Sequence, residues 1–494
     1  MQKRQAIFPV IIVLVFAIIY SLVSFVNHYN LQTNAIDLGL YNNALYSYTH
    51  FKLNYSPLLE PLFPHRNQLA DHFDIFLILI SPLYHVFGSN TLLFIQIISV
   101  LIGGLGIYKF SKQYHKEKYI PALAMLHFFC MWGIFSALSF DYHSIVIAAM
   151  MIPWIYYLSN TDNRLFLIAV TTIAIICKEN VALLLFMVFL GLMLLHYKNK
   201  KKLILMGVLA VCSLFYFYIV MKIIMPALLP SGVNYHHFEY SALGENFKEA
   251  FKTIITKPLY VFNLLFSDPD LQQITYGIKP ETHFYVLFSG GFSFFLNPVL
   301  LFPALVIYAQ KLFHNDFGKW GILVHYSIEF VPLIILSFYM WLSRFKTKIK
   351  YILSIVFISS SITLTVNLFY NPYSKWHNRR QLNLFDKNHY KIEFDAHKVI
   401  KLIKNVPKNL KVSSSTKLVP HLAFRDTIYQ FPFYGNADLI ILLKDFDDRF
   451  PVNEETFQQK IIDLQTDSNW VNCYNKNNLL VFKRKELDYC ITDF

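Results

Sequence analysis

The chain begins with an apolar run that carries no charged residue, IFPVIIVLVFAIIYSLVSFV (residues 7–26). About 20 apolar residues are enough for a helix to span a lipid bilayer. Lys3 and Arg4 precede the run, as in a secretory signal peptide, but the run is too long for one and SFVN (residues 24–27) is a poor cleavage site. The sequence therefore predicts a retained first transmembrane helix.

Similar runs recur over the first three quarters of the chain. Of the 494 residues, 55% are hydrophobic and only 15% are charged, which excludes a soluble globular protein and a disordered one. A shorter run at residues 75–87 contains Pro82 and suits a membrane-surface or re-entrant helix. Together with the first run, about 11 spans are expected, the others lying near residues 89–110, 119–138, 144–158, 164–177, 180–196, 203–225, 283–296, 298–312, 322–342 and 349–370.

The density of charge changes near residue 370. Residues 1–370 hold 25 Lys+Arg and 16 Asp+Glu, whereas residues 371–494 hold 19 and 15 in a third of the length. The first density is typical of a membrane domain and the second of a soluble one. We therefore predict an α-helical polytopic transmembrane domain (1–370) followed by a small soluble α/β domain (371–494). Helices are expected at 395–404, 418–422 and 456–464, and strands at 411–414, 427–429, 438–443, 470–474 and 479–482.

The distribution of basic residues predicts the orientation. Fifteen of the 25 basic residues in the first part, but only two acids, lie in five short loops at 1–6, 109–118, 159–164, 197–202 and 343–350. By the positive-inside rule these loops are cytoplasmic, so the N-terminus lies inside and the C-terminal domain outside. The rest of the chain has 29 Lys+Arg and 29 Asp+Glu. The formal charge of +13 therefore reflects the membrane topology of the chain, and we expect no nucleic-acid partner.

The predicted outer loops are long, at 27–74 and 226–282, and hold most acids of the membrane part. In the first, Asp37 is followed by Leu40, Tyr41, Ala44 and Leu45, the spacing of an apolar helix face. This pattern predicts a helix along the membrane surface with a carboxylate at its beginning. The simpler alternative is that Asp37 caps the helix.

Two further polar groups are expected at the outer face. Asp71, His72 and Asp74 lie within one turn and could bind a divalent cation or orient a phosphate, the alternative being a helix cap with a solvated imidazole. Asp141 and His143 lie in a short link between two spans, where Asp141 could instead cap the next helix.

Ionisable residues also interrupt the apolar runs. Lys178 and Glu179 divide a stretch of apolar residues from 165 to 195. A lysine at the outer end of a membrane helix is suited to bind a phosphate. The alternative is that Lys178 and Glu179 pair with each other. His325 and Glu329 are four residues apart, which predicts a shared helix face. The structural alternative for Glu329 is a pair with a buried His or Lys.

Cysteine usage adds one open question. Cys473 and Cys490 both lie in the tail, and a disulfide is allowed if the tail is outside the cell, although their spacing does not establish one.

Taken in order, these motifs resemble a bacterial family of multi-pass membrane proteins of unknown function, assigned to the GT-C superfamily of glycosyltransferases. The resemblance covers nearly the whole chain, although the family commonly has Gln near the position of Asn43. The matching stretches are DLGLYNN (37–43), HFD (72–74), PLY (82–84), DYH (141–143), KE (178–179), HY (325–326) and LVPHLAFR (418–425).

The resemblance implies a GT-C-like membrane fold and an inverting glycosyltransferase of the bacterial inner membrane. Such an enzyme would move a sugar from a polyprenyl-phosphate donor to a hydroxyl of a lipid or glycan acceptor on the outer face. Asp37 would be the general base. Lys178, His72 and His325 would hold the donor phosphate. The acceptor, or a divalent cation, would be held by Asp71, Asp74, Asp141, His143 and Glu179.

Two other functions remain open. A lipid or solute transporter or flippase would be expected to show related halves with broken helices at mid-membrane, and no internal repeat is evident. A non-catalytic envelope assembly protein would act through its tail.

Overall fold

The computed structural model describes residues 2–59, 67–230, 238–268, 275–370, 384–444 and 449–492. The chain divides into two compact units. Unit 1 comprises residues 1–20, 96–226 and 234–381, and unit 2 comprises residues 21–95, 227–233 and 382–494. The predicted boundary between residues 370 and 371 borders a part of the chain outside the described residues. Unit 2 joins the tail to the first predicted outer loop.

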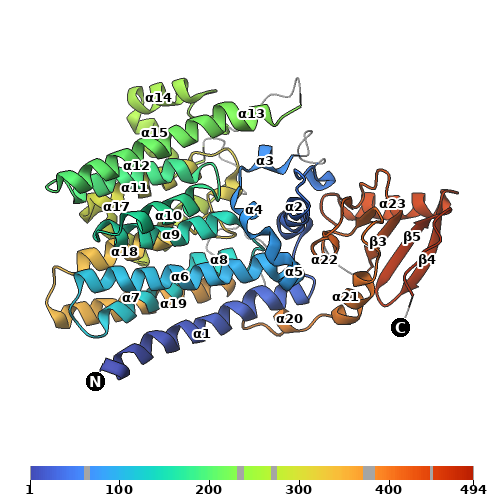
Figure 1. Ribbon diagram of the computed structural model, residues 1–494, viewed down its shortest axis with the longest axis horizontal. Helices are drawn as coiled ribbons and strands as arrows, with labels where there is room; N and C mark the ends of the chain where they lie inside the picture. Colours follow the sequence, from blue (N-terminus) through green and yellow to red (C-terminus); the bar gives the residue numbers. More distant parts are fainter. Residues whose placement is uncertain are drawn as a thin grey trace. The chain divides into compact units, whose positions relative to one another are not determined.

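Unit 1 is a bundle of helices (Figure 1). It contains the first part of α1 (Gln2–Tyr29) and most of α6 (Thr91–Tyr114). The other helices are α7 (Ile120–Phe129), α8 (Trp132–Leu138), α9 (Ser144–Ser159), α10 (Arg164–Ile175), α11 (Val181–Leu195), α12 (Lys200–Ile219), α13 (Met225–Ala227), α14 (Phe247–Thr256), α15 (Pro258–Leu264), α16 (Ile278–Phe288), α17 (Pro298–Leu312), α18 (Phe330–Leu342) and α19 (Thr347–Tyr370).

The structure does not confirm the predicted number of membrane spans in the described residues. In the described residues, four helical stretches are long and apolar enough to cross a membrane: Ile7–Tyr29, Phe76–Tyr114, Lys200–Ala227 and Thr347–Tyr370. The pair α7 and α8, bent by 43°, gives a fifth if it counts as one span. Five further apolar helices, α9, α10, α11, α17 and α18, have 10–17 residues. The count of about 11 spans is therefore not confirmed.

Close helix contacts hold the bundle together. On α11, an added Cβ at Gly191 would lie 2.1 Å from the carbonyl oxygen of Val299 on α17, so only glycine fits there. Small residues that let two backbones approach are a common way for membrane helices to pack, because no hydrophobic effect drives their association in lipid.

The predicted span at 322–342 is wrong in its first part. Helix α18 begins at Phe330, and residues 321–329 form bends and turns. Val324 has a φ of +59°, a left-handed conformation that ends any regular helix. His325 and Glu329 therefore do not share a helix face.

Unit 2 contains a five-stranded mixed sheet in the order β2-β1-β3-β5-β4. Strand β1 pairs in parallel with β2 and β3, while β5 pairs antiparallel with β3 and β4. The predicted elements of the tail are present. They are α21 (Ala396–Lys404), β1 (Val412–Ser414), α22 (Val419–Leu422), β2 (Ile428–Gln430), β3 (Leu439–Leu443), α23 (Glu454–Thr466), β4 (Trp470–Lys476) and β5 (Leu479–Arg484).

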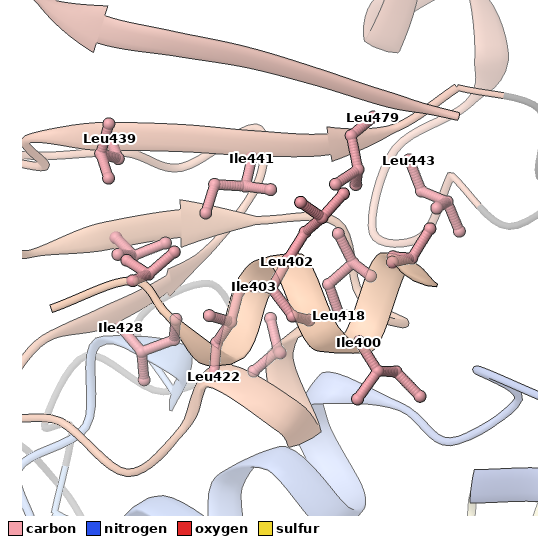
Figure 2. Close-up of a cluster of buried hydrophobic side chains, with 14 of the residues drawn as sticks. Ile400, Leu402, Ile403, Leu418, Leu422, Ile428, Leu439, Ile441, Leu443 and Leu479 are labelled. Atoms are coloured by element: carbon pink, nitrogen blue, oxygen red, sulfur yellow. The ribbon is translucent and has the colours of Figure 1, made fainter. Parts of the chain in front are cut away.

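The two faces of the sheet are covered by different helices. Alternate residues of β3, Leu439 and Ile441, belong to a core that includes Leu402 of α21. The intervening Ile440 packs in a second core with Phe457 of α23. Figure 2 shows side chains of α21, β3 and β5 gathered between the helix and the sheet. This alternation is the period-two pattern of a strand buried on both faces.

The first core also contains residues from the first predicted outer loop. Leu31, Ala35, Leu40, Leu58 and Leu59 are buried in the same cluster as the side chains of α21 and the sheet. The loop and the tail therefore share one hydrophobic core, although more than 300 residues separate them in the chain.

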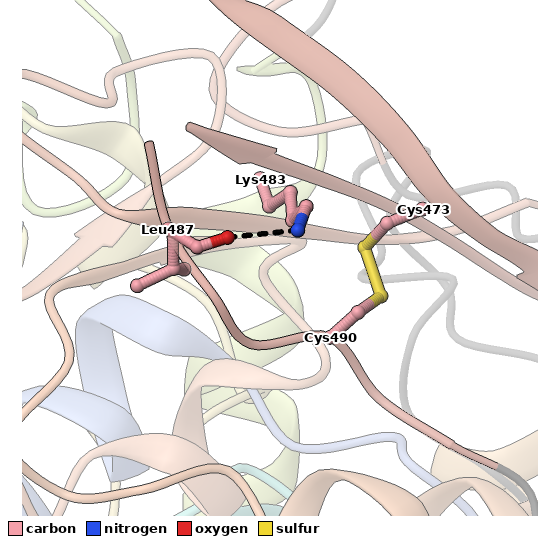
Figure 3. The surroundings of a disulfide bond; sticks show 4 residues. All are labelled: Cys473, Lys483, Leu487 and Cys490. Atoms are coloured by element: carbon pink, nitrogen blue, oxygen red, sulfur yellow. Dashed lines mark hydrogen bonds between the residues drawn. A yellow bond between two sulfur atoms is a disulfide. The ribbon is translucent and has the colours of Figure 1, made fainter. Parts of the chain in front are cut away.

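A disulfide bond joins Cys473 of β4 to Cys490, 17 residues later (Figure 3). Nearby, the Lys483 ammonium donates a hydrogen bond of 2.7 Å to the carbonyl oxygen of Leu487. These contacts fasten the C-terminal segment to the closing hairpin of the sheet.

We expect replacement of both cysteines by serine to destabilise the tail by about 3 kcal/mol, because the bond closes a short loop in the unfolded chain. Hydrogen exchange of the full-length protein should then show faster exchange in β4 and β5. The exposed Cys212 provides a control, since its change to serine should leave these rates unaltered. Unchanged exchange in the double variant would mean that the bond does not stabilise the hairpin.

Candidate active site

Asp37 lies on a short π-helix, η1 (Ala35–Gly39), which leads directly into α2 (Leu40–Thr49). The predicted apolar face of Leu40, Tyr41, Ala44 and Leu45 is buried. The cap positions of η1 and α2 are Asn34 and Gly39, so Asp37 is not the N-cap of either helix. Its side chain is half-buried. Isolated π-helical turns are rare and occur frequently at functional sites.

The tail anchors the start of this π-helix. The Lys417 ammonium donates to the side-chain oxygen of Asn34 at 3.0 Å and to the carbonyl of Gln32 at 2.9 Å. The backbone N–H of Ala35 donates to the Thr416 hydroxyl at 3.2 Å. A cation and a hydroxyl from the tail thus hold Gln32, Asn34 and Ala35, which lie two to five residues before Asp37.

The tail also contacts the following helix. The Asn42 amide donates to the carbonyl of Pro420 at 3.1 Å, and the Asn43 amide donates to the carbonyls of Ala423 and Arg425, both at 2.9 Å. A Cβ added to Gly39 would lie only 2.8 Å from Val419, so the helix approaches the tail too closely for a side chain there. The segments DLGLYNN and LVPHLAFR, noted separately in the sequence, are therefore in direct contact.

Asp71, His72 and Asp74 lie around a second short helix of unit 2, α3 (Gln68–Asp71). Asp71 and Asp74 are buried and His72 is half-buried. The Asp74 carboxylate accepts the backbone N–H of Leu77 at 3.3 Å, in the first turn of α4 (Phe76–Ile80), whose N-cap residue is Ile75. Tyr48 of α2 interacts electrostatically with Asp74, and its hydroxyl donates to Gln68 at 2.7 Å.

In unit 1, Asp141 and His143 lie in the link before α9. The Gln96 side chain bridges this link: its amide donates to the carbonyl of Asp141 and its oxygen accepts the N–H of His143, both at 2.9 Å. Asp141 has a φ of +53°, which Asp tolerates better than most residues. The cap position of α9 is occupied by His143, so Asp141 does not cap that helix.

The structure brings His325 onto this link. The rings of His143 and His325 are stacked with centroids 3.4 Å apart, and Phe140 stacks on both. The two buried imidazoles, 182 residues apart in the chain, thus form one ring contact that their positions in the sequence do not reveal.

Lys178 and Glu179 lie in the break between α10 and α11, as predicted from the interrupted apolar stretch. Lys178 interacts electrostatically with the buried Glu329 and with Lys319. Burial, and then the like charge of Lys178, lower the pKa of Lys319, while Glu239, Asp316 and Glu179 oppose this effect. Several cations and carboxylates of unit 1 therefore surround the break.

Lys311 of α17 holds the loop that carries His325. Its buried ammonium donates to the carbonyl of Gly321 at 2.6 Å, to the Ser327 hydroxyl at 2.8 Å and to the carbonyl of Tyr326 at 3.3 Å. Lys311 also interacts electrostatically with Glu329, so a lysine does accompany this buried carboxyl group. Lys311 is a positioning residue.

We expect Lys311→Met to lower the stability of unit 1 by at least about 1–3 kcal/mol, because buried acceptors lose their donor. Thermal unfolding in detergent measures this change, and Lys346→Met, at an exposed position of the same unit, should have little effect. Equal unfolding temperatures for the two variants would contradict the positioning role.

No group of three or more His, Cys, Asp or Glu side chains in the described part of the chain has the arrangement of a metal site. A divalent cation thus has no complete protein cage among these residues, and the sequence-based assignment to Asp71, Asp74, Asp141, His143 and Glu179 stays a prediction.

Comparison with known proteins gives the family. A family model described as "Predicted membrane protein (DUF2079)" matches residues 27–481. The chain belongs to this family. The resemblance seen in the sequence to multi-pass membrane proteins of unknown function is therefore confirmed, and the match includes both units and every candidate site residue of this DUF2079 protein.

Other comparisons are less informative. No curated protein matches the chain. Among solved structures, it is similar to an oligosaccharyltransferase of Archaeoglobus fulgidus, crystallised with a tethered acceptor peptide that contains the NVT sequon. The identity is 12% and the TM-score 0.38, with 87% of this chain and 64% of that chain covered. The DUF2079 protein thus spans less than two thirds of that chain.

Three residues of the site region were not singled out from the sequence. Gln96, Lys311 and Lys417 are all buried polar residues that hold backbone segments in place. Lys311 lies in the last turn of the apolar helix α17, and this position was an available indication, since a lysine buried there needs partners. Gln96 and Lys417 carry no such sign, because their roles depend on contacts across many residues of the chain.

Proposed function

We propose that this DUF2079 protein is a membrane glycosyltransferase that moves a sugar from a polyprenyl-phosphate donor to an acceptor hydroxyl on the outer membrane face. The observation that carries the proposal is the placement of Asp37. A half-buried carboxylate lies on a π-helical turn whose preceding and following residues are both hydrogen-bonded to the tail. Such fixation suits a group that must meet a reacting proton in one geometry.

In the proposed reaction the acceptor oxygen attacks the anomeric carbon of the sugar. The bond from that carbon to the phosphate oxygen breaks, and polyprenyl phosphate leaves with the electron pair. Asp37 takes the proton of the acceptor hydroxyl, so one base is sufficient and the configuration inverts. A general base of this kind contributes about 10²–10⁴-fold in rate.

Unit 1 would supply groups for the donor phosphate. Lys178, in the break between two apolar helices, is a cation suited to a phosphate as a point charge. His325 and His72 stay sequence-based candidates for binding a donor phosphate. Asp71, Asp74, Asp141, His143 and Glu179 are the candidates for the acceptor or for a divalent cation.

The proposal includes a topology. The N-terminus lies in the cytoplasm, while the first loop and the C-terminal domain face outward from the bacterial inner membrane. About 11 membrane spans, several of them short, would put the N-terminus on the cytoplasmic side and the C-terminal domain on the outer side. A disulfide in the tail is consistent with an oxidising exterior.

Sugar transfer in membrane vesicles tests the function. Vesicles from a deletion strain, with or without the wild-type protein, are supplied with the lipid-linked sugars extracted from wild-type membranes. We expect the protein to consume one lipid-linked sugar and to release polyprenyl phosphate. Equal consumption in both preparations would contradict the proposal, and lipid movement between leaflets without consumption would favour a flippase.

A further inference from the structure

Unit 2 contains a cavity of about 640 Å³ that Asp37 does not line. One wall is the end of α1, from Phe25 to Tyr29, and another is formed by residues 87–94. The tail supplies the remaining wall through α21 and through His421 of α22. None of the sequence-predicted site residues lines this cavity.

The lining is divided between aromatic and basic groups. Phe25, Phe87 and Phe94 supply apolar surface, while His28, Lys404 and His421 supply nitrogen atoms. No carboxylate occurs among its lining residues within the described ranges. A cavity that combines a cation, imidazoles and aromatic rings without an acid is suited to an anion attached to an apolar body.

Three imidazoles line the cavity, those of His28, His397 and His421, and the first and last of them have different roles. His28 is hydrogen-bonded at both ring nitrogens, to the Thr33 hydroxyl at 2.9 Å and to the Ser89 hydroxyl at 2.8 Å. It therefore serves as a fixed platform on which the His421 ring stacks, with centroids 4.0 Å apart.

His421 retains an unused polar atom. Within the described residues, its Nε2 is buried without a hydrogen-bond partner. Burial is the main cause that lowers the pKa of His421 to about 3, and the charge of Lys404 adds to it. Buried polar atoms are generally satisfied, so this nitrogen points to a ligand group in the cavity.

The position of the cavity indicates the source of the ligand. The candidate span Ile7–Tyr29 ends at its wall. On the other side, Gly88–Asn90 precede α6, whose 24 residues alone are long enough to cross a membrane. Two span ends place the cavity at the boundary of the hydrocarbon region, where lipid headgroups lie.

We propose that this cavity binds the phosphate-bearing headgroup of an anionic lipid. The Lys404 ammonium would donate to the phosphate oxygens, the His421 Nε2 would accept a hydrogen bond from a hydroxyl of the monoprotonated phosphate, and the lipid chains would lie along Phe25, Phe87 and Phe94. The site is separate from the residues assigned to the sugar donor, and it does not depend on the proposed transferase activity. A bound lipid would also join the end of α1 to α21 of the tail.

Lipid binding to the full-length protein in a non-ionic detergent tests the site. The probe is fluorescently labelled dioleoyl phosphatidic acid, followed by anisotropy. We expect saturable binding by the wild type and a loss of about tenfold in affinity for Lys404→Gln, the size expected for one charge-assisted contact. Lys398→Gln provides the control, because Lys398 is an exposed lysine of the same helix and does not line the cavity.

Two further measurements keep the outcome decisive. His421→Ala should also weaken binding. Because the His421 ring packs on His28, the thermal unfolding of this variant is measured as well. Lys404 is exposed, so the Lys404→Gln variant is expected to fold. Equal affinities of Lys404→Gln and Lys398→Gln would overturn the proposal. Full competition by millimolar inorganic phosphate would overturn the lipid assignment and indicate a site for free phosphate.

Discussion

Replacing Asp37 with Asn is expected to lower the turnover of sugar transfer by about 10²–10⁴-fold. The amide is nearly the same size as the carboxylate and can stay in the π-helix, so folding should be preserved. It cannot accept the proton of the acceptor hydroxyl at neutral pH. Because the loss concerns a group acting in the transition state, kcat should fall while KM changes little.

The controls for this prediction come from the same unit. Asp37→Glu keeps the base but moves it by one methylene, so partial activity is expected. Asp426→Asn removes an exposed carboxylate that pairs with Lys52 on the surface, and it should be as active as the wild type. If Asp37→Asn retained full activity in vesicles, Asp37 could not be the base.

Replacing Lys178 with Met is expected to have the second largest effect, about 10–100-fold in kcat/KM for the lipid-linked donor. Hydrogen bonds between charged groups contribute about 1.5–3 kcal/mol, which corresponds to this range. The phosphate bears charge in the bound donor and gains more as it leaves, so both KM and kcat should respond. Transfer rates measured at several donor concentrations separate the two effects.

Two variants make the Lys178 result interpretable. Lys178→Arg keeps the positive charge and should recover part of the activity. Lys252→Gln neutralises an exposed lysine of α14 in the same unit and should have no effect. A Lys178→Met protein with an unchanged KM and kcat would remove this residue from the donor site. If the Lys178→Met protein lost activity because it unfolds, Lys178 would have a structural role through its interaction with Glu329.

Local patterns were sufficient to predict the tail. Leu439 to Leu443 of β3, the helical spacing of α21 and the Asn-rich turn at residues 475–478 are signals within a few residues of the elements that they specify. They remain readable because the spacing of apolar residues within each element reflects its own backbone period.

The membrane part was less predictable. Hydropathy locates apolar segments but not their breaks, such as the bend between α7 and α8. The segment 322–329 is apolar enough to suggest a helix, yet Lys311 holds its backbone carbonyls in a loop. That interaction joins residues 10 to 16 positions apart, outside the range of any helical periodicity.

The candidate site was predicted as residues but not as an arrangement. The break at Lys178 and the helix after Asp37 were expected from the sequence. The contact of Asn43 with Ala423, and that of His143 with His325, join positions far apart in the chain. Such contacts depend on the packing of whole elements, so no local pattern indicates that the tail positions the Asp37 helix.

The anomeric configuration of the transferred sugar tests the central claim most directly. Purified full-length protein in liposomes is incubated with its lipid-linked donor and acceptor, and the coupling constant at the anomeric carbon is measured by NMR before and after transfer. A single base at Asp37 predicts complete inversion in the wild type and product formation slowed by about 10²–10⁴-fold with Asp37→Asn. Retention of configuration, or no transfer by the wild type under any donor tested, would contradict the account.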